Sequence, residues 1–278
     1  MDGAHRTENQ ASAASEHRSA GQRTIGEIQR RVLEWYRTAA RDLPWRRTRD
    51  PYRILVSEVM LQQTQAERVI PSYERFVARF PTFEALADAP LAEVIAQWEG
   101  LGYNRRAVYL WRTAREVTQR YGGILPRERQ ALQRLPGIGR YTAGAVACFA
   151  FGEPVAFWDT NIARVLTRIF LGPEARPSAR ELDALADQTL PTDHAYEWNQ
   201  ALMELGAVVC LVRRPRCGIC PVSDSCRSAG TTGGPRRRGE RFEGSRRYYR
   251  GRIVRALRQV RSGLPLDELG RIVRADYT

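Results

Sequence analysis

The chain has 278 residues, and its 44 basic side chains outnumber its 31 acidic ones, which gives a formal net charge of +13. Such an excess favours a polyanionic partner, with nucleic acid ahead of an acidic membrane surface. No apolar run could span a bilayer, and the N-terminus lacks the apolar core of a signal peptide. We therefore expect a soluble protein of the cytoplasm, associated with the nucleoid if the source is bacterial, with no membrane partner.

Along the chain, residues 1–24 are polar and without helical periodicity, and we interpret them as a disordered tail. Apolar residues then recur at helical spacing. The segments they predict as helices are 25–40, 52–65, 66–79, 83–88, 91–98, 104–121, 128–134, 140–151, 161–170, 179–188 and 194–209. Residues 229–244 look like a basic linker, and 245–278 like a short helical extension. Because strand-like alternation is nearly absent, the sequence predicts an all-α fold.

A glycine-rich turn, Leu135-Pro-Gly-Ile-Gly139, precedes the predicted helix 140–151. Gly137 and Gly139 can adopt positive φ and leave the backbone uncovered. The first N–H groups of the next helix have no partner inside it, and they lie at the positive end of the helix dipole. This arrangement is typical of an anion site, for which a nucleic-acid phosphate is the natural ligand in so basic a chain. A turn that merely packs two helices together explains the same residues equally well.

Two carboxylates are candidates for catalysis. Glu58 has Ile54, Leu55 and Leu61 as neighbours one turn away, and burial among them would favour its protonated form, as a general acid requires. A surface glutamate is the alternative. Asp159 precedes the predicted helix 161–170, where an N-cap explains it without any chemistry. Together, one protonated and one ionised carboxylate suit the cleavage of a glycosidic bond.

Four cysteines form the pattern C-x6-C-x2-C-x5-C: Cys210, Cys217, Cys220 and Cys226. In a reducing compartment, four such closely spaced thiols point to a metal site, and both zinc and an iron–sulfur cluster suit them. Cys148 lies among apolar residues and is interpreted as a core residue.

Other residues could contact DNA. Gln63 and Tyr103 are candidates for holding open the gap left by an extruded base, although a polar helix face and a loop aromatic are the alternatives. The basic aromatic segment Arg246-Arg-Tyr-Tyr-Arg-Gly-Arg252 could bind a backbone, or it could be a solvated helix end.

Taken together, these motifs resemble the helix-hairpin-helix DNA glycosylases of the endonuclease III superfamily, and most closely its MutY-type adenine glycosylases. The resemblance covers roughly residues 25–229. It rests on Leu43-Pro-Trp-Arg46, Asp50-Pro-Tyr52, Ser57-Glu-Val-Met-Leu-Gln-Gln-Thr64, Trp98-Glu-Gly-Leu-Gly-Tyr103, Leu135–Gly139 with Tyr141-Thr-Ala-Gly144, Asp159-Thr-Asn161 and the four cysteines.

The resemblance implies two helical domains with the active-site cleft between them. One is a six-helix barrel with the helix-hairpin-helix over 51–154, and the other joins 25–50 to 155–228 and holds a 4Fe-4S cluster on the four cysteines. Glu58 would be the adenine-protonating acid and Asp159 the essential aspartate, oriented by Asn161. Gln63 and Tyr103 would intercalate near the lesion. Trp45, Arg46 and Gln200 would line the adenine pocket.

The same resemblance implies a monomeric base-excision-repair enzyme that acts on double-stranded DNA and removes adenine mispaired with 8-oxoguanine or guanine. Tyr141 stands where bifunctional members carry a lysine, and the chain has no lysine, so we predict no β-lyase step. About fifty residues follow the cysteines, which is too few for the family's C-terminal 8-oxoguanine-inspecting domain; the resemblance is to a short form. A thymine or uracil mismatch glycosylase acting opposite guanine is the alternative, and a non-catalytic cluster-bearing DNA-binding protein is the third hypothesis.

Overall fold

The computed structural model describes residues 24–232, 241–258, 260 and 263–274. Apart from Thr24, which already lies in a helix, the predicted N-terminal tail falls outside the described residues, as do 233–240 of the linker and 259, 261–262 and 275–278 of the extension. No strand occurs among the described residues, and the predicted all-α class is confirmed. No helix in this part of the chain is long and apolar enough to cross a bilayer.

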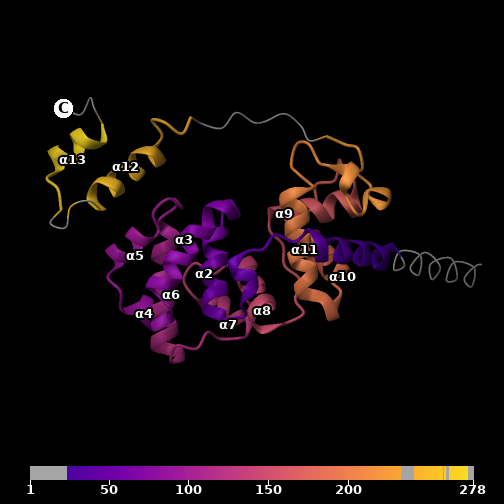
Figure 1. The fold of residues 1–278 in the computed structure, drawn as a ribbon, viewed down its shortest axis with the longest axis horizontal. Helices are drawn as coiled ribbons and strands as arrows, with labels where there is room; N and C mark the ends of the chain where they lie inside the picture. Colours follow the sequence, from indigo (N-terminus) through magenta and orange to yellow (C-terminus); the bar gives the residue numbers. More distant parts are fainter. Residues whose placement is uncertain (1–23, 233–240, 259, 261–262, 275–278) are drawn as a thin grey trace, which may run out of the picture. The chain divides into compact units, whose positions relative to one another are not determined.

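The first helix covers residues 24–39. The elements that follow are η1 (Pro44–Arg47), α2 (Pro51–Leu61), α3 (Ala66–Arg79), α4 (Phe83–Asp88), α5 (Leu91–Gln97), α6 (Arg105–Tyr121), α7 (Arg129–Arg134), α8 (Arg140–Phe151), α9 (Thr160–Leu166), the π-helical turn η2 (Thr167–Leu171), α10 (Ala179–Thr189), η3 (Thr192–His194), α11 (Ala195–Val208), η4 (Cys217–Ile219), η5 (Ser223–Ser225), α12 (Arg246–Arg258) and α13 (Leu266–Val273) (Figure 1).

Most helix boundaries follow from local chemistry. The Asp50 carboxylate accepts the Arg53 N–H at 2.7 Å and so begins α2, and Ser178 with Glu181 forms a complete capping box on α10. The prediction that α2 continues to residue 65 is wrong. The helix ends at Leu61 because Gln63 has φ 56°, which no α-helix accommodates.

The chain groups into two compact units, each built from discontinuous segments. The first unit takes the described residues of Met1–Ile54, Arg127–Gln133 and Ile138–Gly234, and the second those of Leu55–Pro126, Arg134–Gly137 and Pro235–Thr278. Residues 138–154, which the sequence analysis assigns to the six-helix barrel, thus group with the first unit. The predicted division into two domains stays a prediction.

In the second unit, α6 forms the centre, because α4 and α5 both pack against it and α3 packs on α5. The rings of Phe80 and Trp98 meet Phe76 edge to face, with centroids 5.0 and 5.7 Å away. All three side chains are fully buried.

In the first unit, α9 packs against α11 and α10, and α8 packs against α11. Two glycines permit the closest approaches. A Cβ added to Gly144 would lie 2.8 Å from the Phe157 Cβ, and one added to Gly206 would lie 2.7 Å from the Asn161 Cβ. The sequence therefore needs glycine on α8 and α11 to bring the backbone against the segment from Phe157 to Asn161.

Candidate functional site

Glu58 lies in the middle of α2 and is buried, with only 2 % of its surface exposed. The helix is covered almost all the way round, since Val56, Ser57, Val59 and Met60 are buried as well. An acidic side chain is rarely buried to this extent unless it is paired or has a functional role. Its burial agrees with the sequence analysis, whereas its role as an acid stays a prediction.

Asp159 is the N-cap of α9, as the simpler interpretation predicted, and its carboxylate is held by three donors. Oδ1 accepts the backbone N–H of Asn161 at 2.9 Å and that of Ile162 at 2.8 Å, while Oδ2 accepts the Asn161 side-chain amide at 3.1 Å. The Asn161 amide is fixed in turn by Arg164, whose Nη2 donates to Asn161 Oδ1 at 2.8 Å. The capping role thus gives the half-buried carboxylate a single orientation.

The segment before Asp159 is fastened by Asp183 of α10. This carboxylate accepts the Trp158 indole N–H at 2.9 Å and Arg140 Nη2 at 2.8 Å. The hydrogen bonds from Arg140 and Trp158 hold the pKa of Asp183 below its usual range, so it stays ionised. Tyr141, on α8, meets the Phe157 ring edge to face with centroids 5.6 Å apart. Tyr141 and Asp159 therefore belong to one packed part of the first unit.

The glycine-rich turn between α7 and α8 uses its two glycines differently. Gly137 has φ 76°, and an added Cβ would lie 2.7 Å from the Tyr109 Cβ. Gly139 has φ −90° and ψ −176°, so the prediction of left-handed freedom there is wrong. Gly139 is instead the N-cap of α8, and it offers no side chain to the first N–H groups of that helix. The start of such a helix, at the positive end of its dipole, is a place where an anion such as a phosphate can bind.

Gln63 and Tyr103 are the two described non-glycine residues with positive φ, at 56° and 47°. Both are exposed, Tyr103 by 46 %. Holding an ordinary residue in this conformation costs energy and requires support from its surroundings. The strain marks both turns as candidates for function.

Arg106 of α6 supplies that support for both turns. Its Nη1 donates to the carbonyls of Val59 at 3.0 Å and Met60 at 2.8 Å, and also to the carbonyl of Gln62. Its Nη2 donates to the carbonyls of Leu101 at 3.1 Å and Gly102 at 3.2 Å, and to Thr64 Oγ1 at 3.1 Å. Burial lowers the pKa of Arg106 to about 10, so the side chain is still a cation at neutral pH.

Arg46 and Gln200 meet in the first unit, and Trp45 is buried next to Arg46 in η1. Arg46 Nε donates to Gln200 Oε1 at 2.9 Å, and its Nη2 reaches Glu204 Oε2 at 2.7 Å. Arg41 Nε donates to Glu204 Oε1 at 2.6 Å. The Glu204 side chain is completely buried. Burial alone would raise the pKa of Glu204, but the hydrogen bonds and charges of Arg41 and Arg46 outweigh it and leave the pKa below its usual value.

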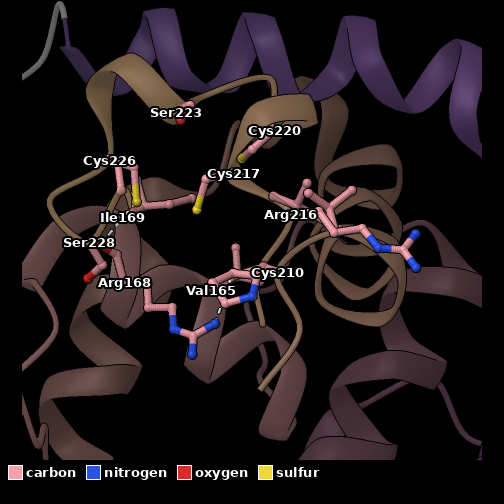
Figure 2. A pocket seen from close by; sticks show the side chains of 14 residues that line it. Val165, Arg168, Ile169, Cys210, Arg216, Cys217, Cys220, Ser223, Cys226 and Ser228 are labelled. Carbon is pink, nitrogen blue, oxygen red and sulfur yellow. Dashed lines mark hydrogen bonds between the residues drawn. The ribbon is translucent and has the colours of Figure 1, made fainter. Parts of the chain in front are cut away.

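The four cysteines surround one pocket in the first unit (Figure 2). Buried apolar side chains, among them Val165, Ile169 and Leu205, form part of its other walls. No three His, Cys, Asp or Glu side chains in the described part of the chain gather closely enough to hold one metal ion. Four thiols around one pocket are a donor set that suits an iron–sulfur cluster.

The chemistry of the donor set agrees with a cluster. Burial raises the pKa of the Cys220 thiol to about 11 and also raises the pKa of Cys226, so a strongly electrophilic metal group is needed to deprotonate them. Arg168 Nη1 approaches Cys210 Sγ at 3.4 Å and donates to the Leu211 carbonyl at 2.7 Å. A cation beside this sulfur suits a thiolate ligand.

The predicted residues fall into two sets. Glu58, Gln63, Tyr103 and Gly137 lie in the second unit, and the first unit holds the remaining members: Trp45, Arg46, Gly139, Tyr141, Asp159, Asn161, Gln200 and the four cysteines.

Sequence reasoning missed four charged side chains that hold the candidates in place: Arg106, Arg164, Asp183 and Glu204. For Glu204 the signal in the sequence is a charge within an otherwise apolar segment, Ala201-Leu-Met-Glu-Leu205. That pattern does not reveal the partner.

Comparison with known proteins supplies the context for this geometry. Residues 56–191 match the family model of HhH-GPD superfamily base excision DNA repair proteins. Residues 210–226 match the iron–sulfur binding domain of endonuclease III, which confirms the predicted 4Fe-4S cofactor and covers all four cysteines.

Individual proteins are similar over most of the chain. An adenine DNA glycosylase of Mycolicibacterium smegmatis is 47 % identical over 82 % of this chain and 79 % of its own length. The solved structure of a thermostable thymine-DNA glycosylase is 36 % identical with a TM-score of 0.70, covering 74 % of this chain and 97 % of that one. A trapped endonuclease III–DNA covalent intermediate is 25 % identical with a TM-score of 0.66, covering 75 % and 96 %.

Proposed function

Since the chain belongs to the HhH-GPD superfamily of base excision DNA repair proteins, we propose that it is a monofunctional DNA glycosylase that removes adenine mispaired with 8-oxoguanine or guanine. The observation that carries the proposal is the buried Glu58, 2 % exposed, in a chain 47 % identical to an adenine DNA glycosylase. The protein binds double-stranded DNA as a monomer.

The chemistry requires an acid because adenine leaves deoxyribose poorly unless one of its ring nitrogens is protonated. Glu58 donates that proton, and its burial keeps water from competing for it. Departure of the base leaves positive charge near C1′ of the sugar. Asp159 stabilises that charge as a carboxylate, and water completes the hydrolysis.

The surroundings of Asp159 favour this role. The N–H groups of Asn161 and Ile162 and the Asn161 amide fix both carboxylate oxygens, so little reorganisation is needed as the charge develops. Trp45, Arg46 and Gln200 line the adenine pocket. The iron–sulfur cluster, when bound, cross-links the four cysteines of residues 210–226 and so stabilises this part of the fold.

Contacts with DNA come from the helix-hairpin-helix and from the two strained turns. The N-terminal end of α8, whose N-cap is Gly139, binds a backbone phosphate. Gln63 and Tyr103 enter the base stack beside the extruded nucleotide, where an exposed ring or amide replaces lost stacking. Gln63 and Tyr103 are already exposed in the structure, so neither has to be uncovered before it contacts DNA.

A substrate panel tests the proposal. The holoprotein is incubated with duplexes that carry adenine opposite 8-oxoguanine, adenine opposite guanine, thymine opposite guanine or uracil opposite guanine, and alkali then cleaves any abasic site. We expect cleavage at adenine only, and Asp159→Asn should abolish turnover while duplex binding persists.

The runner-up function is removal of thymine or uracil opposite guanine, which the likeness to the thymine-DNA glycosylase structure favours. Cleavage at the pyrimidines with none at adenine would replace the first proposal by this one. Binding without cleavage of any duplex would contradict both.

A further inference from the structure

The C-terminal helix α12 is fixed to the second unit at two points. Near its start, Arg247 Nη1 donates to the Tyr103 hydroxyl at 2.8 Å, and the guanidinium lies 5.7 Å from the centre of the Tyr103 ring. At its end, Arg258 Nη2 donates to the Ile95 carbonyl, and Nη1 lies 3.5 Å from Glu99 Oε1. The Arg258 side chain is only 17 % exposed.

These two anchors lie on one face of the helix. Residues 247 and 258 are about three full helical turns apart, so their side chains point the same way. The chain from Ile95 to Tyr103 therefore provides a docking strip along the length of α12. The helix is held beside the Tyr103 turn rather than attached only through its linker.

The opposite side of α12 is covered by α13, and the two helices pack as a pair (Figure 1). Arg252 Nη2 donates to the Ile272 carbonyl at 2.7 Å, and Ala256 and Val273 are both buried. One face of α12 thus contacts the segment from Ile95 to Tyr103, and the opposite face packs against α13. The two sides of the helix between these faces, its flanks, remain exposed.

Those flanks are strongly cationic. The helix carries Arg at six of its thirteen positions and no acidic residue. Arg246, Arg250 and Arg255 are exposed, and no hydrogen bond or ion pair involves them within the described residues. Arg246 and Arg250 are four residues apart, so they share one flank, at the end of the helix nearest the Tyr103 turn.

We propose that α12 is a built-in DNA-binding arm: docked through Arg247 and Arg258, it presents Arg246 and Arg250 to backbone phosphates of the duplex beside the Tyr103 turn. The inference rests on the proposed function, because Tyr103 places the duplex there. A duplex fits this flank better than an acidic protein does, since the flank continues the surface around Tyr103 and offers guanidinium groups for paired phosphate contacts.

The salt dependence of DNA binding tests the arm. Affinity of the full-length holoprotein for an undamaged 25-base-pair duplex is measured from about 50 to 300 mM salt. Log affinity falls as log salt rises, and each lost phosphate contact makes that slope shallower by about 0.9. Arg246→Ser/Arg250→Ser should therefore reduce the magnitude of the slope by about 1.8. The matched control, Arg112→Ser/Arg115→Ser, removes the same charge from α6 and should leave the slope within about 0.5 of wild type.

A second variant separates a docked arm from a loose cationic tail. Arg258→Met removes the anchor but keeps Arg246 and Arg250. We expect it to reduce the magnitude of the salt slope by at least half as much as Arg246→Ser/Arg250→Ser does. A wild-type slope in Arg246→Ser/Arg250→Ser, or a slope change equal to that of the α6 control, overturns the inference. Because the duplex is undamaged, these outcomes are independent of adenine release, which the substrate panel measures separately.

Discussion

Arg106→Met is the substitution that most directly tests how the two strained turns are held. Methionine fills much of the same volume and keeps the apolar stem, but it donates no hydrogen bond. The carbonyls of Val59, Met60 and Leu101 would lose the donor that Arg106 provides in the structure. Gly102 keeps a donor, because the Trp98 indole N–H reaches its carbonyl at 3.2 Å.

The magnitude follows from these contacts. An unsatisfied buried carbonyl costs about 1–3 kcal/mol, so three of them cost about 3–9 kcal/mol. Removing a buried cation returns part of its desolvation penalty, which opposes the loss. We expect a net loss of about 3–5 kcal/mol in the free energy of unfolding, or a fall in melting temperature of about 10 °C.

Thermal and urea unfolding of the holoprotein provide the assay, followed by circular dichroism. Arg112→Met is the matched control, because Arg112 is exposed on the same helix and should change stability by less than about 0.5 kcal/mol. Arg106→Lys should fall between the two, since an ammonium group replaces some of the six contacts. If Arg106→Met and Arg112→Met unfold alike, Arg106 does not support the turns and the reasoning fails.

Three further predictions concern Glu204, Gly206 and the absence of lysine. Glu204→Gln should cost about 3 kcal/mol near neutral pH because it leaves Arg41 and Arg46 without their buried counter-charge. The pKa of Glu204 in the folded protein is lowered, so the carboxylate contributes its full stabilisation above the pKa of an unfolded glutamate and loses it as pH falls through the folded pKa. If the difference in free energy of unfolding between wild type and Glu204→Gln fails to shrink in acid, this argument is contradicted. Gly206→Ala should destabilise by about 1–3 kcal/mol and slow adenine release, since the new methyl meets Asn161 at 2.7 Å; unchanged stability and rate would refute the close packing. Borohydride should trap no covalent DNA adduct once the N-terminal amine is blocked, because the chain has no lysine; a trapped adduct would refute monofunctional chemistry.

The sequence predicted the parts of the fold that depend on local pattern. Helical periodicity and the Asp50-Pro51 start predict the position of α2, and the cysteine spacing predicts the metal site. The N-cap interpretation of Asp159 is also correct, because capping is a property of neighbouring residues. The end of α2 cannot be predicted in the same way, because nothing local in Gln62-Gln63-Thr64 signals a left-handed residue.

The supporting contacts could not be predicted because they join residues far apart in the chain. Arg106 reaches back more than forty positions to the end of α2, and Arg41 and Arg46 reach Glu204 across more than one hundred and fifty. The hydrophobic periodicity of a helix shows that a charge at a buried position is unusual, but it does not identify the residue that pairs with it. The same holds for Arg247, whose partner Tyr103 is 144 positions away.

The central claim is that Glu58 protonates the adenine that Asp159 helps to release, and single-turnover release of free adenine tests it directly. Wild-type holoprotein and Glu58→Gln are compared on a duplex with adenine opposite 8-oxoguanine, with binding to an uncleaved duplex as the control. The account predicts a rate about 10²–10⁴ times slower for Glu58→Gln, with binding within about threefold of wild type. Adenine release by Glu58→Gln at the wild-type rate would contradict it.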